Sequence, residues 1–172
     1  MNIQIRRMEK TDVETIVKLE ELSYGQHHWS KESFYNELTN NLAHYFCAIN
    51  DSGQIIGYVG CWHIFDEAHI TTLSVHPDFR KQGVAQQLLF TIIDGCYKNK
   101  IKYITLEVRA SNIAAISLYE KNGFKSIGTR KGYYQDNNED ALIMWTENIF
   151  YDKFKTIFNE NKNKLESLIR VR

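Results

Sequence analysis

The hydrophobic pattern changes its period in the middle of the chain, and this change restricts the fold more than any other feature. Residues 68–75 predict a strand that stops at His76–Pro77, as a strand stops before a turn. Beyond a glycine-containing loop, apolar side chains return at every fourth position, at Val84, Leu88, Ile92 and Cys96. This spacing puts them on one face of a long amphipathic helix. We therefore predict a strand, a turn and a helix in direct succession.

The rest of the chain also mixes strand and helix patterns. Apolar alternation predicts strands over residues 3–5 and 101–108, and other extended segments predict strands over 45–49, 54–65, 125–130 and 141–146. Helical spacing predicts helices after Thr11, after Ser30 and over 114–121, the last of which stops at Asn122–Gly123. The turn-like residues 50–53 make the second and third strands a hairpin. We therefore expect an α+β (mixed α/β) fold.

Composition describes an ordinary globular protein. The chain has 172 residues, of which 43% are apolar and 24% are charged, and folding at this length buries roughly 70% of the unfolded chain's surface. Its 21 basic and 21 acidic residues balance, which argues against a nucleic-acid partner. No window approaches ~18 apolar residues, which argues against export and membrane spanning. The odd, scattered cysteines predict reduced thiols and a cytoplasmic location: Cys47, Cys61 and Cys96.

The last residues read as an appended amphipathic helix. Apolar side chains of residues 149–172 fall near one helical face, and six basic minus three acidic residues give this segment a charge of +3. A helix packed on its own domain or on a second subunit explains the pattern, and a basic contact with a membrane or a ribosome is the alternative. We expect one domain over 1–148 and a helical extension over 149–172.

The loop after the central strand is a candidate phosphate site. The N-terminus of a helix has about four unpaired N–H groups and about half a positive charge, which suits a pyrophosphate. Gly83 lets the backbone come close, and Arg80 and Lys81 add positive charge. Many strand-to-helix turns have a glycine and a basic residue for geometric reasons alone, so this motif leaves both readings open.

A second block, residues 106–124, favours the phosphate site over the purely geometric explanation. Together the two blocks resemble the GNAT superfamily of acetyl-coenzyme A-dependent N-acetyltransferases, over roughly residues 3–146. Arg80-x-x-Gly83-x-Ala85 fits that family's pyrophosphate pattern, and 112–124 is similar to its coenzyme-flanking helix. Several segments resemble one branch, RimI and its archaeal and eukaryotic N-terminal acetyltransferase relatives: 107–112, Leu118-Tyr119-Glu120, Tyr133-Tyr134 and 139–141.

The resemblance implies a fold, a cosubstrate and a set of site residues. The implied GNAT fold is a mixed, mostly antiparallel sheet, flanked by helices, whose central parallel strands splay apart. Acetyl-coenzyme A is the implied cosubstrate, and Asn112 would touch its pantetheine arm. Glu107 matches the family's general base and Tyr119 its general acid. Other implied coenzyme contacts are the backbone of Leu73, Ser74 and Val75, and, around the pyrophosphate, Lys81, Gln82, Gly83, Val84, Ala85 and Gln86.

Ordinary pKa values favour an N-terminal acceptor. An α-amine has a pKa of about 7.7 to 8.0 and a lysine amine about 10.4, which makes the α-amine easier to deprotonate by ~3.4 kcal/mol. A glutamate near 4.3 falls ~5 kcal/mol short as a direct base, so we expect Glu107 in a partly desolvated cleft, acting through a water. A tyrosine near 10 protonates a thiolate at a cost of only ~2 kcal/mol. The N–H of Val75 is the candidate oxyanion donor.

Each assigned role has a simpler alternative. Glu107 and Arg109 lie on one face of the predicted strand and can pair with each other. Tyr119 can be a packed helix aromatic, and Asn112 can be the N-cap of the helix that follows it. The six histidines have no metal-ligand spacing, so no metal is expected. We expect His27 and His28 on a loop surface.

Aromatic and acidic residues gather between the last two predicted strands: Tyr133, Tyr134, Asp136, Glu139 and Asp140. They suit a lip for a cationic, extended peptide end, or they form a solvated hairpin loop. The RimI resemblance implies the N-terminal alanine of small-subunit ribosomal protein eighteen as acceptor. The alternatives are a small amine, such as a polyamine or an antibiotic, and a non-catalytic coenzyme-binding module. The presence of both Glu107 and Tyr119 argues against the last, and the oligomeric state stays open.

Overall fold

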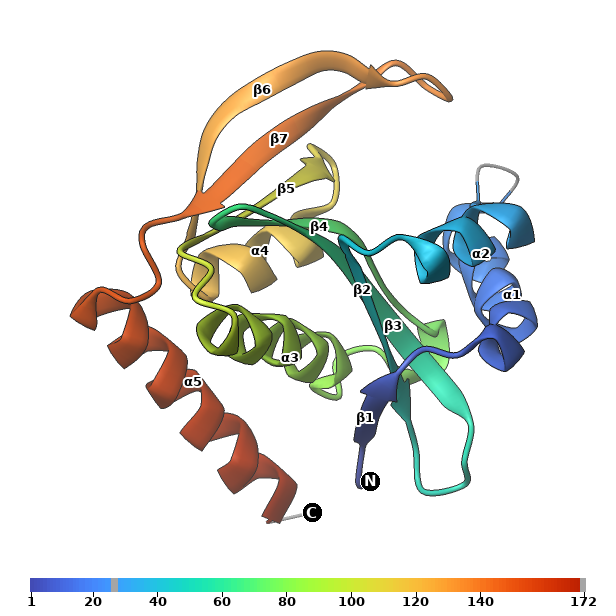
Figure 1. Ribbon diagram of the computed structural model, residues 1–172, viewed down its shortest axis with the longest axis horizontal. Helices are drawn as coiled ribbons and strands as arrows, with labels where there is room; N and C mark the ends of the chain where they lie inside the picture. Colours follow the sequence, from blue (N-terminus) through green and yellow to red (C-terminus); the bar gives the residue numbers. More distant parts are fainter. Residues whose placement is uncertain (26–27, 171–172) are drawn as a thin grey trace. The chain divides into compact units, whose positions relative to one another are not determined.

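The computed structural model describes residues 1–25 and 28–170, so the expectations for His27 and for the last two residues of the tail lie outside it (Figure 1). The strands are β1 (Gln4–Arg7), β2 (Ala43–Ile49), β3 (Ile55–Ile64), β4 (Glu67–Val75), β5 (Tyr103–Arg109), β6 (Phe124–Tyr134) and β7 (Glu139–Thr146). The α-helices are α1 (Val13–Tyr24), α2 (Lys31–Thr39), α3 (Val84–Lys98), α4 (Ile113–Lys121) and α5 (Asp152–Arg170). Short 3-10 helices are η1 (Lys10–Asp12) and η3 (Pro77–Phe79).

The seven strands form one mixed sheet in the order β1-β2-β3-β4-β5-β7-β6. Neighbours pair antiparallel in the β1–β2, β2–β3, β5–β7 and β6–β7 ladders. Strands β4 and β5 run parallel, and their ladder joins Glu67–Ile70 to Tyr103–Leu106. Helices connect strands that are not joined by hairpins, as a parallel pair requires. The sheet confirms the predicted mixed α/β, mostly antiparallel fold class.

Internal contacts divide the chain into two compact units. The first contains residues 1–63 and 71–94, and the second contains 64–70 and the residues from 95 onward. Strand β4 and helix α3 therefore contribute residues to both units. The sequence predicted a single domain over 1–148, and that boundary stays a prediction.

The first unit has a core that the helical spacing of its sequence explains. Apolar residues on one face of α1, among them Val13 and Ile16, are fully buried together with Phe34 of α2. Helices α1 and α2 lie beside each other (blue, Figure 1). The Phe34 ring meets the buried Tyr58 of β3 edge to face, with ring centroids 5.7 Å apart. Burial of such side chains contributes about 1.5–3 kcal/mol each, and this core holds β2 and β3 against the two helices.

The turn between β2 and β3 forms because of Asn50. Its Oδ1 accepts hydrogen bonds from the backbone N–H of Ser52 at 3.1 Å and of Gln54 at 2.9 Å. Gly53 has φ of +80°, a conformation that glycine adopts without steric strain. The predicted hairpin is therefore present, with β2 and β3 antiparallel.

The second unit includes the long β6–β7 hairpin (orange, Figure 1) and the tail helix α5. Phe154 and Phe158 of α5 are buried, and the Asn161 side-chain amide donates to the carbonyl of Lys121 and to Asn122 Oδ1, both at 3.0 Å. A Cβ on Gly123 would lie 2.9 Å from the Phe154 ring. Helix α5 therefore packs on its own unit. None of the helices in the described ranges has the length and apolar character needed to cross a membrane.

Candidate active site

The loop before α3 exposes backbone N–H groups at a helix start. Lys81 and Gly83 both have left-handed backbone conformations, with φ of +59° and +85°. Such residues, alternating with ordinary ones, turn successive N–H groups toward one side and make an anion-binding concavity. Helix α3 then begins, with Gln87 N–H donating to the Gly83 carbonyl at 3.0 Å. The N–H groups of its first turn have no partner within the helix, so the loop fits a phosphate group.

The end of β4 leads directly into this loop and is held from both sides. Ser74 and Val75 are buried, and Ser74 Oγ lies 2.9 Å from Ser23 Oγ of α1. A Cβ on Gly57 would lie only 2.9 Å from the Ser74 carbonyl oxygen, so Gly57 permits the close approach of two strands. Arg80 Nε donates to the Val75 carbonyl at 3.3 Å. The predicted coenzyme residues 73–75 and 81–86 therefore belong to one continuous segment of the first unit.

Glu107 lies in the second unit, on β5, opposite the core-facing side chains. Ile104, Leu106 and Val108 are buried, as the alternation predicted. The side chain of Glu107 is 15% exposed, and its Oε2 lies 2.6 Å from His69 Nε2 of β4. Arg130 Nε of β6 lies 3.5 Å from its Oε1. The predicted alternative partner, Arg109, binds elsewhere.

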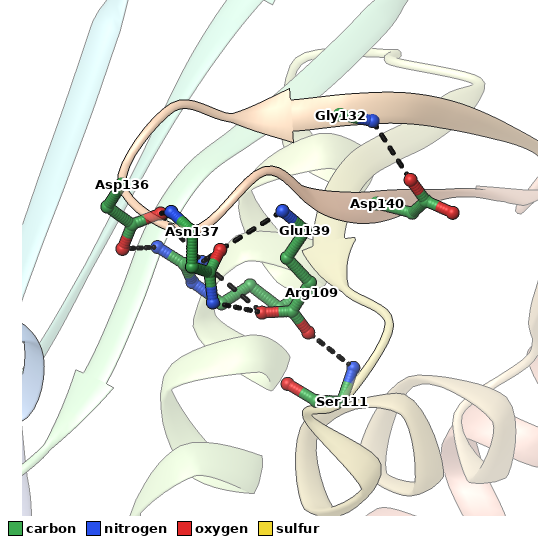
Figure 2. Close-up of polar contacts among 7 residues, drawn as sticks. All are labelled: Arg109, Ser111, Gly132, Asp136, Asn137, Glu139 and Asp140. Atoms are coloured by element: carbon green, nitrogen blue, oxygen red, sulfur yellow. Dashed lines mark hydrogen bonds and ion pairs between the residues drawn. The ribbon is translucent and has the colours of Figure 1, made fainter.

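Arg109 binds the tip of the β6–β7 hairpin. Figure 2 shows Asp136, Asn137 and Glu139 gathered around its guanidinium group. Arg109 Nη2 donates to Asp136 Oδ2 at 2.8 Å, and Nη1 donates to Glu139 Oε2 at 3.3 Å. Its Cζ also lies 3.9 Å from the centre of the Tyr134 ring. We call Arg109, Tyr134, Asp136, Asn137 and Glu139 the hairpin clamp.

The clamp extends to the turn before α4. Glu139 Oε1 accepts a hydrogen bond from the backbone N–H of Ser111 at 2.8 Å, and hydrogen bonds from Ser111 lower the pKa of Glu139 to about 2. Asp140 Oδ1 accepts from Gly132 N–H at 2.9 Å (Figure 2). The acids that the sequence suggested for a cationic peptide thus hold the hairpin itself. Tyr133 remains half exposed.

Helix α4 carries the other two predicted residues. Asn112 is its N-cap, because Asn112 Oδ1 accepts from Ala115 N–H at 3.1 Å. Tyr119 is buried and its ring centroid lies 5.3 Å from that of Phe124. Both simpler readings, a cap and a packed aromatic, are therefore confirmed, and neither excludes a second role. The coenzyme contact of Asn112 and the acid role of Tyr119 stay predictions.

Comparison with known proteins shows the family of this chain. Residues 11–124 match the model of the acetyltransferase (GNAT) family. This chain belongs to the GNAT acetyltransferase family. It is 38% identical over 141 residues to a protein of Bacillus subtilis (strain 168), and the alignment covers 82% of this chain and 93% of that protein. The Bacillus protein carries the provisional name ribosomal protein bS18-alanine N-acetyltransferase.

Two solved structures are similar to this GNAT protein. The ribosomal-protein-S18-alanine N-acetyltransferase of Escherichia coli is 32% identical, with a TM-score of 0.78 over 85% of this chain and 94% of that one. The PaiA N-acetyltransferase of Thermoplasma acidophilum, solved in complex with coenzyme A, is 24% identical with a TM-score of 0.73, over 86% of this chain and 99% of that one. The second likeness concerns the fold alone.

Sequence reasoning missed the two residues that contact Glu107 in this GNAT protein. His69 lies on β4, which pairs with β5, and Arg130 lies on β6, which pairs with β7. No sequence pattern reveals either register. The sequence predicted a strand over 68–75 but assigned no role to His69, whose neighbours Ala68 and Ile70 are buried. Within residues 1–25 and 28–170, no group of three or more His, Cys, Asp or Glu side chains is placed to hold a metal ion.

Proposed function

We propose that this protein transfers the acetyl group of acetyl-coenzyme A to the N-terminal alanine of ribosomal protein bS18, and so acts in the cytoplasm. One observation carries the proposal: two proteins named for this activity are 38% and 32% identical to the chain and are covered over 93% and 94% of their length. Both relatives are thus matched over nearly their whole length.

The first unit supplies a binding segment for the coenzyme. Acetyl-coenzyme A brings the acetyl group as an activated thioester. The left-handed residues Lys81 and Gly83 and the first turn of α3 offer N–H donors to its pyrophosphate, and the Arg80 and Lys81 side chains add positive charge. Residues 73–75 would offer strand backbone to the pantetheine arm and the acetyl group. The donor set, neutral N–H groups plus cations, suits a phosphate anion.

The second unit supplies the candidate acid and base. Glu107 would accept the proton that the acceptor ammonium must lose. Only 15% of its side chain is exposed, which limits the number of bulk water molecules that can solvate the carboxylate. Tyr119 would donate a proton to the departing thiolate sulfur, which restores the free thiol of the coenzyme. An α-amine suits this chemistry better than a lysine, because its ordinary pKa is lower by more than two units.

A competition assay tests the proposal. Acetyl-coenzyme A is supplied with a peptide of the bS18 N-terminus, the same peptide beginning with Ser or Met, and spermidine, and products are read by mass spectrometry. We expect the alanine peptide to be acetylated first, at its α-amine. Tyr119→Phe should lower kcat at least tenfold, by removing the general acid, and should leave the Kd for acetyl-coenzyme A within twofold.

Two results would contradict this proposal. Preferential acetylation of spermidine would assign the protein to small-amine chemistry. Binding of acetyl-coenzyme A without transfer to any of the four acceptors would indicate a binding module.

A further inference from the structure

His69 and Glu107 meet because of the strand register between β4 and β5. His69 pairs with Thr105 across the parallel ladder, and paired residues project to the same face of a sheet. Glu107 follows Thr105 by two positions, so it projects to that face as well. The ladder ends at Leu106, one residue before Glu107. The two side chains are therefore diagonal neighbours on adjacent strands of the second unit.

The contact between them requires a proton. His69 Nε2 and Glu107 Oε2 are 2.6 Å apart, which is short for a hydrogen bond and typical of one with an ionised partner. A carboxylate has only acceptor atoms, and a neutral imidazole has one N–H and one acceptor nitrogen. Two bare acceptors would repel each other at this distance. We therefore assign Nε2 as the protonated nitrogen of His69.

Arg130 does not make an equivalent contact. Its Nε lies 3.5 Å from Glu107 Oε1, beyond the usual hydrogen-bond range, and 54% of its side chain is exposed. A flexible, solvated cation at that distance contributes little to orientation. The side chain of His69 is only 33% exposed, and its ring has two torsions to fix. The orientation of the Glu107 carboxylate thus depends mainly on His69.

We propose that His69 is the positioning residue of the general base in this GNAT protein: it holds Oε2 of Glu107, so that Oε1 faces the water through which the acceptor loses its proton. This inference rests on the proposed function and goes beyond it by adding a residue. In the step concerned, an N–H bond of the acceptor ammonium breaks and its electron pair stays on nitrogen. A proton reaches the Glu107–His69 pair through that water, and the pair loses its negative charge.

Two substitutions at position 69 distinguish a positioning role of the His69 N–H group from a role of its ring in packing. His69→Phe keeps a ring but has no donor, and His69→Gln has an amide N–H of similar reach to Nε2. We expect kcat for the alanine peptide to fall about 10- to 100-fold in the Phe variant and to recover to within about threefold in the Gln variant. The KM and Kd for acetyl-coenzyme A should stay within twofold. His44→Gln is the matched control, because His44 stacks on His63 at 4.0 Å in the first unit, and its kcat should not change.

A double substitution tests whether His69 acts through Glu107. In a Glu107→Gln background, His69→Phe should lower kcat by less than twofold, since residues that act as a unit are not additive. An unchanged kcat in His69→Phe, a Gln variant as slow as the Phe variant, or full additivity in the double variant would each overturn the inference. All three leave the proposed function intact, because it depends on whether the wild-type protein acetylates the peptide.

Discussion

At the scale of single residues, helix α1 carries a buried carboxyl group, whose burial costs free energy when the group is ionised. Glu20 is 2% exposed, and its Oε2 accepts a hydrogen bond from Trp29 N–H at 3.3 Å. Its Oε1 is buried and finds no partner in the part of the chain that the structure describes. Burial therefore raises the pKa of Glu20 from its ordinary 4.5 to about 7. A protonated carboxyl group fits this place better than an ionised one.

Stability should follow the protonation of Glu20. Its pKa is higher in the folded protein, so between pH 4.5 and about 7 the folded protein binds more protons than the unfolded chain. The free energy of unfolding then falls as pH rises through this window, by up to about 3 kcal/mol. Glu20→Gln should remove that fall. Urea unfolding at pH 5 and pH 8.5 measures it, with the exposed Glu32→Gln of α2 as control. Equal pH slopes in wild type and Glu20→Gln would refute the assignment.

The position of the candidate base Glu107 was predictable from the sequence of its own strand, but the residues beside it were not. Alternation along 101–108 placed Glu107 opposite Ile104, Leu106 and Val108, and the structure confirms this placement. The same pattern allowed a pair between Glu107 and Arg109. Which cation or ring lies beside a strand residue depends on the register of the neighbouring strand. Strands β4 and β5 are parallel and no hairpin joins them, so no turn fixes their register and it results from packing across the sheet.

At the scale of elements, the hairpin clamp is the feature that the sequence could not specify. The acids at the hairpin tip predicted a charged loop, and a pattern of charges does not tell whether they face a partner or their own chain. Arg109 Nη1 and Nη2 both bind the tip, and hydrogen bonds to charged groups contribute about 1.5–3 kcal/mol each. The hairpin also extends further than expected, because β6 runs to Tyr134.

Removal of the clamp should loosen the hairpin tip. Arg109→Met keeps most of the apolar stem, loses the hydrogen bonds and the Tyr134 stacking, and leaves the Asp136 and Glu139 carboxylates without this cation. We expect amide hydrogen exchange to rise at least tenfold over residues 132–139, and the free energy of unfolding to fall by about 2 kcal/mol. The exposed Lys131→Met of the same hairpin is the control. Unchanged protection at the tip in Arg109→Met would show that the clamp is not needed.

At the scale of the whole molecule, the order of helices and strands was predictable from the sequence, but their division into two compact units was not. Apolar spacing along 84–96 and the stop at Asn122–Gly123 foretold α3 (Val84–Lys98) and the end of α4. Local periodicity acts within an element, so it identifies elements reliably. The assignment of 64–70 to the same unit as 95 onward depends on pairing between distant strands. Such pairing follows from the summed packing of the chain.

The tail helix should be part of the stable structure of the second unit. Phe154 is 1% exposed and packs on Gly123, so Phe154→Ala should lower the free energy of unfolding by about 3–5 kcal/mol. Tyr151→Ala, at an exposed position near the start of the same helix, should cost under 1 kcal/mol. Chemical denaturation of both variants measures the difference. Similar losses in the two variants would indicate that the tail is not docked through Phe154.

The contact of Asn161 with the end of α4 sets an order of events during synthesis. The last carbonyl groups of a helix need donors from outside it, and at Lys121 the donor is an amide that is translated 40 residues later. In a nascent chain, the Lys121 carbonyl of the Tyr119-bearing helix therefore receives this hydrogen bond only after residue 161 has left the exit tunnel. Until then, water must donate the hydrogen bond to that carbonyl oxygen.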